Sequence, residues 1–139
     1  MNFTRRPYAA FVVSSDVVFT EQLETTILKQ FQIRTYRFGE KDLRNILRIS
    51  KPLVILWDGR QPSAQSRHFL HWLREHFPGC PILALLNDEQ SDSDLEYHKL
   101  GINLLLDTSS TSFFENLCNH IGAIIRDCEL VGYSSMSTK

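Results

Sequence analysis

Residues 53–58 read Leu53-Val54-Ile55-Leu56-Trp57-Asp58, five apolar side chains followed by one carboxylate. A strand that is apolar on both faces is typical of the centre of a parallel sheet, because helices cover both sides of such a sheet. Pro62 follows Asp58 by four residues, which indicates a turn directly after the strand. An open α/β sheet places its functional acid at the carboxyl end of a central strand. Asp58 is therefore the first candidate functional residue.

Outward from this run, short apolar segments alternate with segments of helical periodicity. The segments that predict strands are 8–13, 32–38, 53–57, 81–86 and 103–106, and those that predict helices are 17–31, 41–49, 63–77, 92–100 and 112–130. Strict alternation predicts a parallel sheet with helices on both faces, joined by right-handed crossovers. Five strands favour the order 2-1-3-4-5, which brings the carboxyl ends of the first and third strands together. We therefore predict an α/β fold, a flavodoxin-like, doubly wound, five-stranded parallel sheet with five helices.

Length and composition place the chain among ordinary globular domains. At 139 residues, 42% hydrophobic and 22% charged, it is long enough for one domain with a core, which we assign to residues 1–131. The serine-rich residues 132–139 predict a linker or disordered tail that leads to an output domain.

Charge and hydropathy exclude two classes of partner. The net charge of −1 provides no basic footprint, so this domain alone is not expected to bind nucleic acid. No apolar run is long enough for a membrane span, and the short start lacks the apolar core of a secretory signal. Three cysteines, Cys80, Cys118 and Cys128, lack metal-ligand spacing, and we interpret them as buried thiols in a reducing, cytoplasmic compartment.

Taken in order, these segments resemble the receiver domain of bacterial two-component response regulators, over roughly residues 8–127. Ser14-Ser15-Asp16 resembles the end of that family's first strand, where a pair of acidic residues sits. Asp58-Gly59-Arg60-Gln61-Pro62 resembles its phosphoacceptor aspartate and the following turn. Residues 81–87 resemble the fourth strand, and residues 105–109 resemble the fifth strand and its Lys-Pro loop.

The chain departs from the family pattern where the family's chemistry resides. Ser14 and Ser15 replace the acidic pair, Leu86 replaces the switch Thr or Ser, Leu105 replaces the switch aromatic, and Thr108 and Ser109 replace Lys-Pro. Phosphoryl transfer depends on positioning and charge neutralisation, and Mg²⁺ sites are usually anchored by carboxylates. The resemblance therefore implies a degenerate receiver, or pseudo-receiver. Its phosphoacceptor-equivalent position is Asp58, and its pocket positions are Ser14, Ser15, Asp16, Arg60, Leu86, Asn87 and Thr108.

Three interpretations of Asp58 stay open at this point. It is a carboxylate satisfied by turn amides or by Arg60, a working phosphoacceptor, or a constitutive contact in which Arg60 stands in for a missing cation.

Other kinds of site have weaker support. No glycine-rich loop follows the first strand and no Gly-x-Ser-x-Gly elbow occurs, so we expect no cofactor and no catalytic residues. His68, His71 and His76 lie on one predicted helix, where a solvated face is favoured over a metal site.

The last helix carries an apolar arc wider than packing on one sheet requires. Either the sheet and neighbouring elements cover it on two sides, or it also supplies a protein interface. For the second case we expect a homodimer, or docking on a partner protein, through the face built from residues 92–100, the fifth strand and the last helix. The interface candidates are Leu105, Phe114, Cys118 and Ile125.

The function predicted from the sequence is an atypical, phosphorylation-independent receiver domain of a signalling or transcription regulator. It would act through protein–protein contact and dimerisation rather than as an enzyme. The alternatives are a conventional receiver phosphorylated on Asp58 by a histidine kinase, and a small flavodoxin-like enzyme or cofactor binder.

Overall fold

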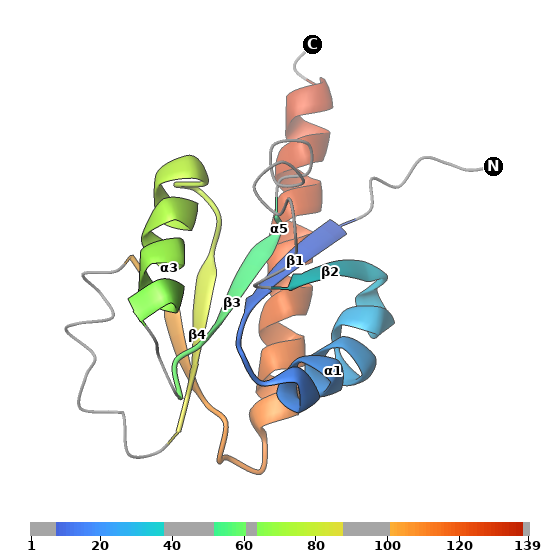
Figure 1. The fold of residues 1–139 in the computed structure, drawn as a ribbon. Helices are drawn as coiled ribbons and strands as arrows, with labels where there is room; N and C mark the ends of the chain where they lie inside the picture. The colour runs from blue at the N-terminus through green and yellow to red at the C-terminus, as the bar shows by residue number, and fades with distance from the viewer. Residues whose placement is uncertain (1–7, 38–51, 61–63, 88–100, 138–139) are drawn as a thin grey trace.

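The computed structural model describes residues 8–37, 52–60, 64–87 and 101–137, and these form an α/β fold around one parallel sheet (Figure 1). The strands are β1 Tyr8–Val13, β2 Ile33–Arg37, β3 Val54–Asp58, β4 Ile82–Leu86 and β5 Leu104–Asp107. The helices are α1 Val17–Thr26, the 3₁₀ helix η1 Leu28–Phe31, α3 Ala64–His76 and α5 Phe113–Ser137.

The strand order is β2-β1-β3-β4-β5, and each neighbouring pair is parallel. This confirms the flavodoxin-like sheet predicted from the sequence. All five predicted strands are present, and their ends differ from the prediction by at most one residue among the described positions. The described residues contain three α-helices, and the helices predicted for 41–49 and 92–100 lie outside them.

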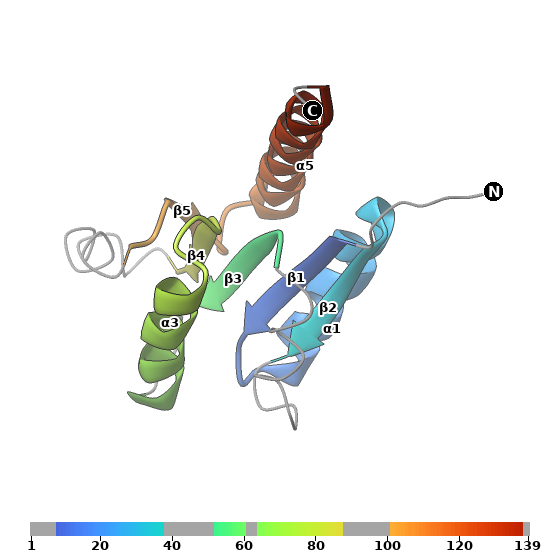
Figure 2. The ribbon, with the colours of Figure 1, turned by 90° about the horizontal axis from the view of Figure 1, so that it is seen from above.

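Helices cover both faces of the sheet: α1 and α5 pack on one face and α3 on the other (Figure 2). Side chains along each strand alternate between these two faces. In β1, Phe11 and Val13 point into the core under α3, whereas Ala10 and Val12 point into the core under α1 and α5. Two hydrophobic cores therefore hold the central strands in place.

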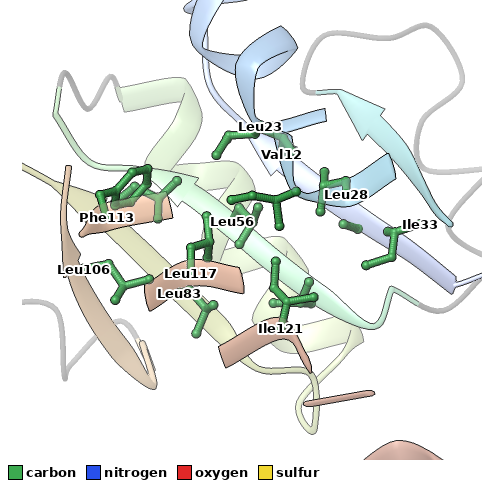
Figure 3. Close-up of a cluster of buried hydrophobic side chains, with 14 of the residues drawn as sticks. Val12, Leu23, Leu28, Ile33, Leu56, Leu83, Leu106, Phe113, Leu117 and Ile121 are labelled. Carbon is green, nitrogen blue, oxygen red and sulfur yellow. The ribbon is translucent and has the colours of Figure 1, made fainter. Parts of the chain in front are cut away.

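The core under α1 and α5 packs both helices against the same face of the sheet (Figure 3). Leu23 of α1 and Leu117 and Ile121 of α5 are fully buried there, against Leu56 and other strand residues. Full burial of such a side chain contributes roughly 1.5–3 kcal/mol. This packing sets the positions at which the first turns of α1 and α5 begin.

The ends of two helices differ from the prediction by more than one residue. The segment 17–31 is not one helix, because α1 ends at Thr26 and the tighter η1 follows. Gln32 then takes a left-handed backbone conformation (φ 57°), and its N–H bonds back to the carbonyls of Leu28 and Lys29. This turn closes η1 and reverses the chain into β2.

The last helix is longer than predicted: α5 continues to Ser137, whereas we expected it to end near Leu130. Residues 132–137 are thus helical, and the assignment of residues 132–139 to a linker or disordered tail stays a prediction. One interior glycine costs a helix only about 1 kcal/mol, and residues 131–137 contain no proline to stop it. Whether this segment links to an output domain stays a prediction. Within the described part of the chain, no helix combines the length and apolar character needed to cross a membrane.

Candidate functional site

Asp58 is the last residue of β3 and lies at the carboxyl edge of the sheet, beside the end of β1. Its side chain shares a face with Val54 and Leu56, so it points toward the side of α1 and α5. Only 8% of the residue is exposed. A carboxylate this buried requires hydrogen-bond donors or a counter-charge.

Arg60 supplies most of those donors. Its Nε donates to Oδ1 of Asp58 at 2.9 Å, and its Nη2 donates to Oδ2 at 2.9 Å, a two-pronged pairing of guanidinium and carboxylate. The backbone N–H of Arg60 also donates to Oδ1, at 3.2 Å. The turn after β3 thus returns the side chain of Arg60 onto the strand's terminal acid.

Ser14 and Asp16 complete the cluster from the loop after β1. The hydroxyl of Ser14 donates to Oδ2 of Asp58 at 2.6 Å, and its oxygen accepts from the backbone N–H of Asp16 at 3.1 Å. Asp16 caps α1, because its Oδ1 accepts from the N–H of Phe19 at 3.0 Å. Its Oδ2 accepts from Arg60 Nη2 at 3.1 Å. The guanidinium therefore bridges two carboxylates on separate segments.

The phenyl ring of Phe19 forms another wall of the site. The Cζ atom of Arg60 lies 3.9 Å from the centroid of that ring, a cation–π contact. The sequence analysis missed Phe19 as a site residue. The signal was available, since it is the third helical residue after a capping aspartate, which places it over the loop that precedes the helix.

Electrostatics favours the charged forms of Asp58 and Arg60. Burial alone would raise the pKa of Asp58, but the hydrogen bonds from Arg60 and Ser14 outweigh it and hold that pKa below its ordinary value. The same hydrogen bond to Asp58 raises the pKa of Arg60, against the effect of its partial burial. Two carboxylates and one guanidinium leave the cluster with one net negative charge.

Leu86 ends β4 on the other side of Asp58, where it turns into the core under α3. A Cβ added to Gly59 would lie 2.5 Å from its Cδ2 and 3.0 Å from the ring of Trp57. Leu86 thus packs directly against the turn after Asp58, which leaves room only for glycine there. Its side chain offers no hydrogen-bond donor to this edge of the sheet.

The remaining predicted pocket positions, Ser15, Asn87 and Thr108, follow the ends of β1, β4 and β5 at the same edge of the sheet. Ser15 is exposed, and Asn87 and Thr108 are half-buried. The backbone N–H of Thr108 donates to the carbonyl of Leu86 at 2.7 Å, which ties the loop after β5 to the end of β4. The structure therefore brings Ser14, Asp16 and Arg60 onto Asp58.

The interface candidates separate into covered and exposed positions. Leu105 packs against the core under α3, Ile125 packs against the core under α1 and α5, and the Sγ of Cys118 donates to Gln30 at 3.4 Å. Phe114 is 37% exposed. The apolar arc of α5 is thus partly covered on two sides, by the sheet and by η1 with its flanking residues, and whether the helix also supplies a protein interface stays a prediction.

The histidines and cysteines do not form a metal site in the residues that the structure describes, where no group of three potential ligands gathers. His68, His71 and His76 are exposed, and the ring of His76 stacks on Trp72 with centroids 4.1 Å apart. Cys80 is buried, which raises the pKa of its thiol to about 12. Cys128 is exposed, so its interpretation as a buried thiol was wrong: α5 residues beyond Ile125 have left the sheet.

Comparison with known proteins gives a fold but no sequence relative. No protein-family model matches the chain, and no curated protein matches it either. The chain is similar to the solved structure of chemotaxis protein CheY4 from Vibrio cholerae, with 15% identity, 86% of this chain and 99% of that chain covered, and a TM-score of 0.69. It is similar to the N-terminal signal receiver domain of a two-component response regulator from Bacteroides fragilis, with 15% identity, coverage of 86% and 97%, and a TM-score of 0.68.

A third similar structure is described as an adenylate cyclase from Rhodopirellula baltica, with 18% identity, coverage of 96% and 98%, and a TM-score of 0.70. At such identities the likeness concerns the arrangement of the chain alone. The chain therefore has the fold of response-regulator receiver domains.

Proposed function

We propose that this chain is a receiver-type signalling domain that acts through protein–protein contact without phosphorylation. The observation that carries the proposal is the guanidinium of Arg60, which is paired with both oxygens of Asp58 and also bonded to Asp16. In this proposal the guanidinium of Arg60 supplies the counter-charge of Asp58.

Nucleophilic attack by Asp58 would require a free carboxylate oxygen. Oδ1 accepts from Nε and the backbone N–H of Arg60, and Oδ2 accepts from Nη2 of Arg60 and from Ser14. Attack on a phosphodonor would therefore break charge-assisted hydrogen bonds, which are about twice as strong as neutral ones.

A divalent cation would face the same obstacle. Mg²⁺ requires a near-octahedral set of oxygen ligands, usually with carboxylates among them. The guanidinium already lies between Asp58 and Asp16, and Ser14 and Ser15 add no charge. Binding of Mg²⁺ would need displacement of Arg60 and would then place two cations close together.

Three positions around the site also lack side chains that would bind a phosphoryl group through a positive charge or change conformation in response to it. Leu86 and Leu105 have apolar side chains, and both pack into the core under α3. Thr108 carries no positive charge. These residues support a domain that keeps the receiver fold and has lost its switch.

The wider proposal concerns the setting of this domain. It is a non-catalytic part of a signalling or transcription regulator in the cytoplasm, and it forms a homodimer or binds a partner protein. With a net charge of −1, contact with DNA belongs to an output domain rather than to this one.

Intact-mass measurement after incubation with Mg²⁺ and acetyl phosphate or phosphoramidate tests the proposal. We expect no species heavier by one phosphoryl group, whereas a conventional receiver treated alongside gains one. A phosphorylated species that the Asp58→Asn variant fails to form would contradict the proposal and support the conventional receiver. Stabilisation by FMN against heat would instead support the cofactor-binding alternative.

A further inference from the structure

A column of aromatic rings leads from the ion pair to the surface of α5. The guanidinium of Arg60 lies over the ring of Phe19, 3.9 Å from its centroid. The ring of Phe19 stacks on that of Phe113, with centroids 6.3 Å apart and an angle of 26° between the planes. Phe113 in turn meets Phe114 edge-on, with centroids 5.1 Å apart.

The rings of Phe19 and Phe113 are buried, and they belong to different helices. Phe19 lies in the first turn of α1, and Phe113 is the first residue of α5. Interiors are close-packed, so a displaced ring displaces its neighbours. A change at Arg60 therefore reaches the start of α5 through van der Waals contact.

Arg60 holds α1 at two points. It bonds to the capping carboxylate of Asp16 and covers the ring of Phe19, whose own N–H bonds to that same carboxylate. Loss of the guanidinium would thus release both the cap and the ring. The first turn of α1 is the element through which Arg60 acts.

On the opposite face of the sheet, the described aromatic rings run from Phe11 through Phe69 and Trp72 to His76, along β1 and α3. Leu86 is the last residue of β4, and Leu105 lies in β5. Both side chains pack into the core under α3. Phe19 and Phe113 belong to the other core, under α1 and α5, which is also the face toward which Asp58 points. The aromatic column therefore follows the face of the sheet that carries the charge.

We propose that Arg60 is a positioning residue that sets the packing of the first turn of α5 through Phe19 and Phe113. It thereby couples the Asp58–Arg60 pair to the exposed ring of Phe114. The coupling does not depend on the proposed function, since any event that removes Arg60 from Asp58, phosphorylation included, acts on the same rings.

Backbone amide chemical shifts of the ¹⁵N-labelled full chain test the coupling. The change is Arg60→Ala, and the readout is the pair of amides at Phe113 and Phe114, which sense ring currents. The matched control is Arg37→Ala. It breaks an ion pair between β2 and α1, Arg37 Nη2 to Glu24 at 2.6 Å, away from the first turn of α1. We expect shift changes at Phe113 and Phe114 that are several-fold larger for Arg60→Ala than for the control.

The same substitution made in a Phe19→Leu variant tests whether the coupling runs through the ring of Phe19. In Phe19→Leu the ring that joins Arg60 to Phe113 is absent, so adding Arg60→Ala should leave the amides of Phe113 and Phe114 where Phe19→Leu alone puts them. Equal changes in both backgrounds, or changes no larger than those of Arg37→Ala, would overturn the proposal. If Arg60→Ala does not fold by circular dichroism, Arg60→Lys carries the same comparison, because it keeps the charge and loses the planar fork. No phosphodonor is used, so this test can fail independently of the phosphorylation test.

Discussion

At the scale of single residues, the site is decided by how Asp58 is neutralised. Removal of one partner of a buried ion pair destabilises a protein, because it leaves the other charge buried and uncompensated. Asp58 is almost fully buried, whereas about a quarter of the Arg60 side chain is exposed, so solvent reduces the value of the pair. The contribution to stability therefore lies between those of a surface pair and a fully buried one.

We predict that Asp58→Asn lowers the free energy of unfolding at pH 7 by about 1–3 kcal/mol, between the surface and buried limits. Because the pKa of Asp58 is depressed in the folded state, its contribution is fully present above the ordinary value of 3.8 and is lost as pH falls through the folded pKa. The gap between wild type and variant should thus be constant from pH 7 to about 5 and should close below 3.8. Urea unfolding followed by circular dichroism measures it, and a gap that widens in acid would contradict the depressed pKa.

At the scale of the element, α5 shows how one helix can bury a wide apolar arc within its own domain. Phe113, Leu117 and Ile121, spaced by four, form the fully covered stripe on the sheet. Ile124 and Ile125 are partly buried at the edge of the same core, beside that stripe. Beyond residue 125 the helix leaves the sheet, and Leu130 is 65% exposed.

Two leucines on α5 allow a matched comparison. Leu117→Ala should lower the free energy of unfolding by about 2–5 kcal/mol, since it opens a cavity in the core. Leu130→Ala should change it by less than about 0.5 kcal/mol, because the same side chain is exposed there. Chemical denaturation of both variants measures these changes. A large loss of unfolding free energy for Leu130→Ala would mean that this end of the helix is covered in solution.

At the scale of the whole molecule, the described surface carries few large apolar side chains. Those that are exposed among the described residues are Val17, Val18, Phe114 and Leu130. A domain that does not respond to a phosphoryl group must populate its contacts without one, because a ligand that does not bind cannot shift an equilibrium. Two-fold pairing is the commonest way for a protein to bury such a surface.

We predict a dimer at micromolar concentration that includes the start of α5 and is insensitive to phosphodonors. Phe114→Glu should convert it to a monomer with unchanged circular dichroism. Val18→Glu, an equally drastic change on exposed α1, should leave it dimeric. Light scattering over a dilution series measures this, and a monomer at hundreds of micromolar would refute homodimerisation.

Much of this architecture follows from local patterns in the sequence. The apolar run before Asp58 predicted a central strand, and the alternation of strands and helices predicted the observed order of the sheet. Such features are accessible because burial on one or both faces of a strand imposes a periodicity that each segment carries by itself. The positions of Ser14, Asp16 and Asp58 at one edge followed from the same topology.

Other properties depend on contacts between segments that are distant in the chain. The pairing of Arg60 with both oxygens of Asp58, its bridge to Asp16 and its stack on Phe19 require the return of one side chain across three segments. The burial of Cys118 and Ile125 likewise depends on what packs beside α5. Side-chain direction and coverage are set by tertiary packing and not by spacing along the chain, and for that reason only the folded structure could show that Arg60 bridges Asp58 and Asp16 and lies over the ring of Phe19.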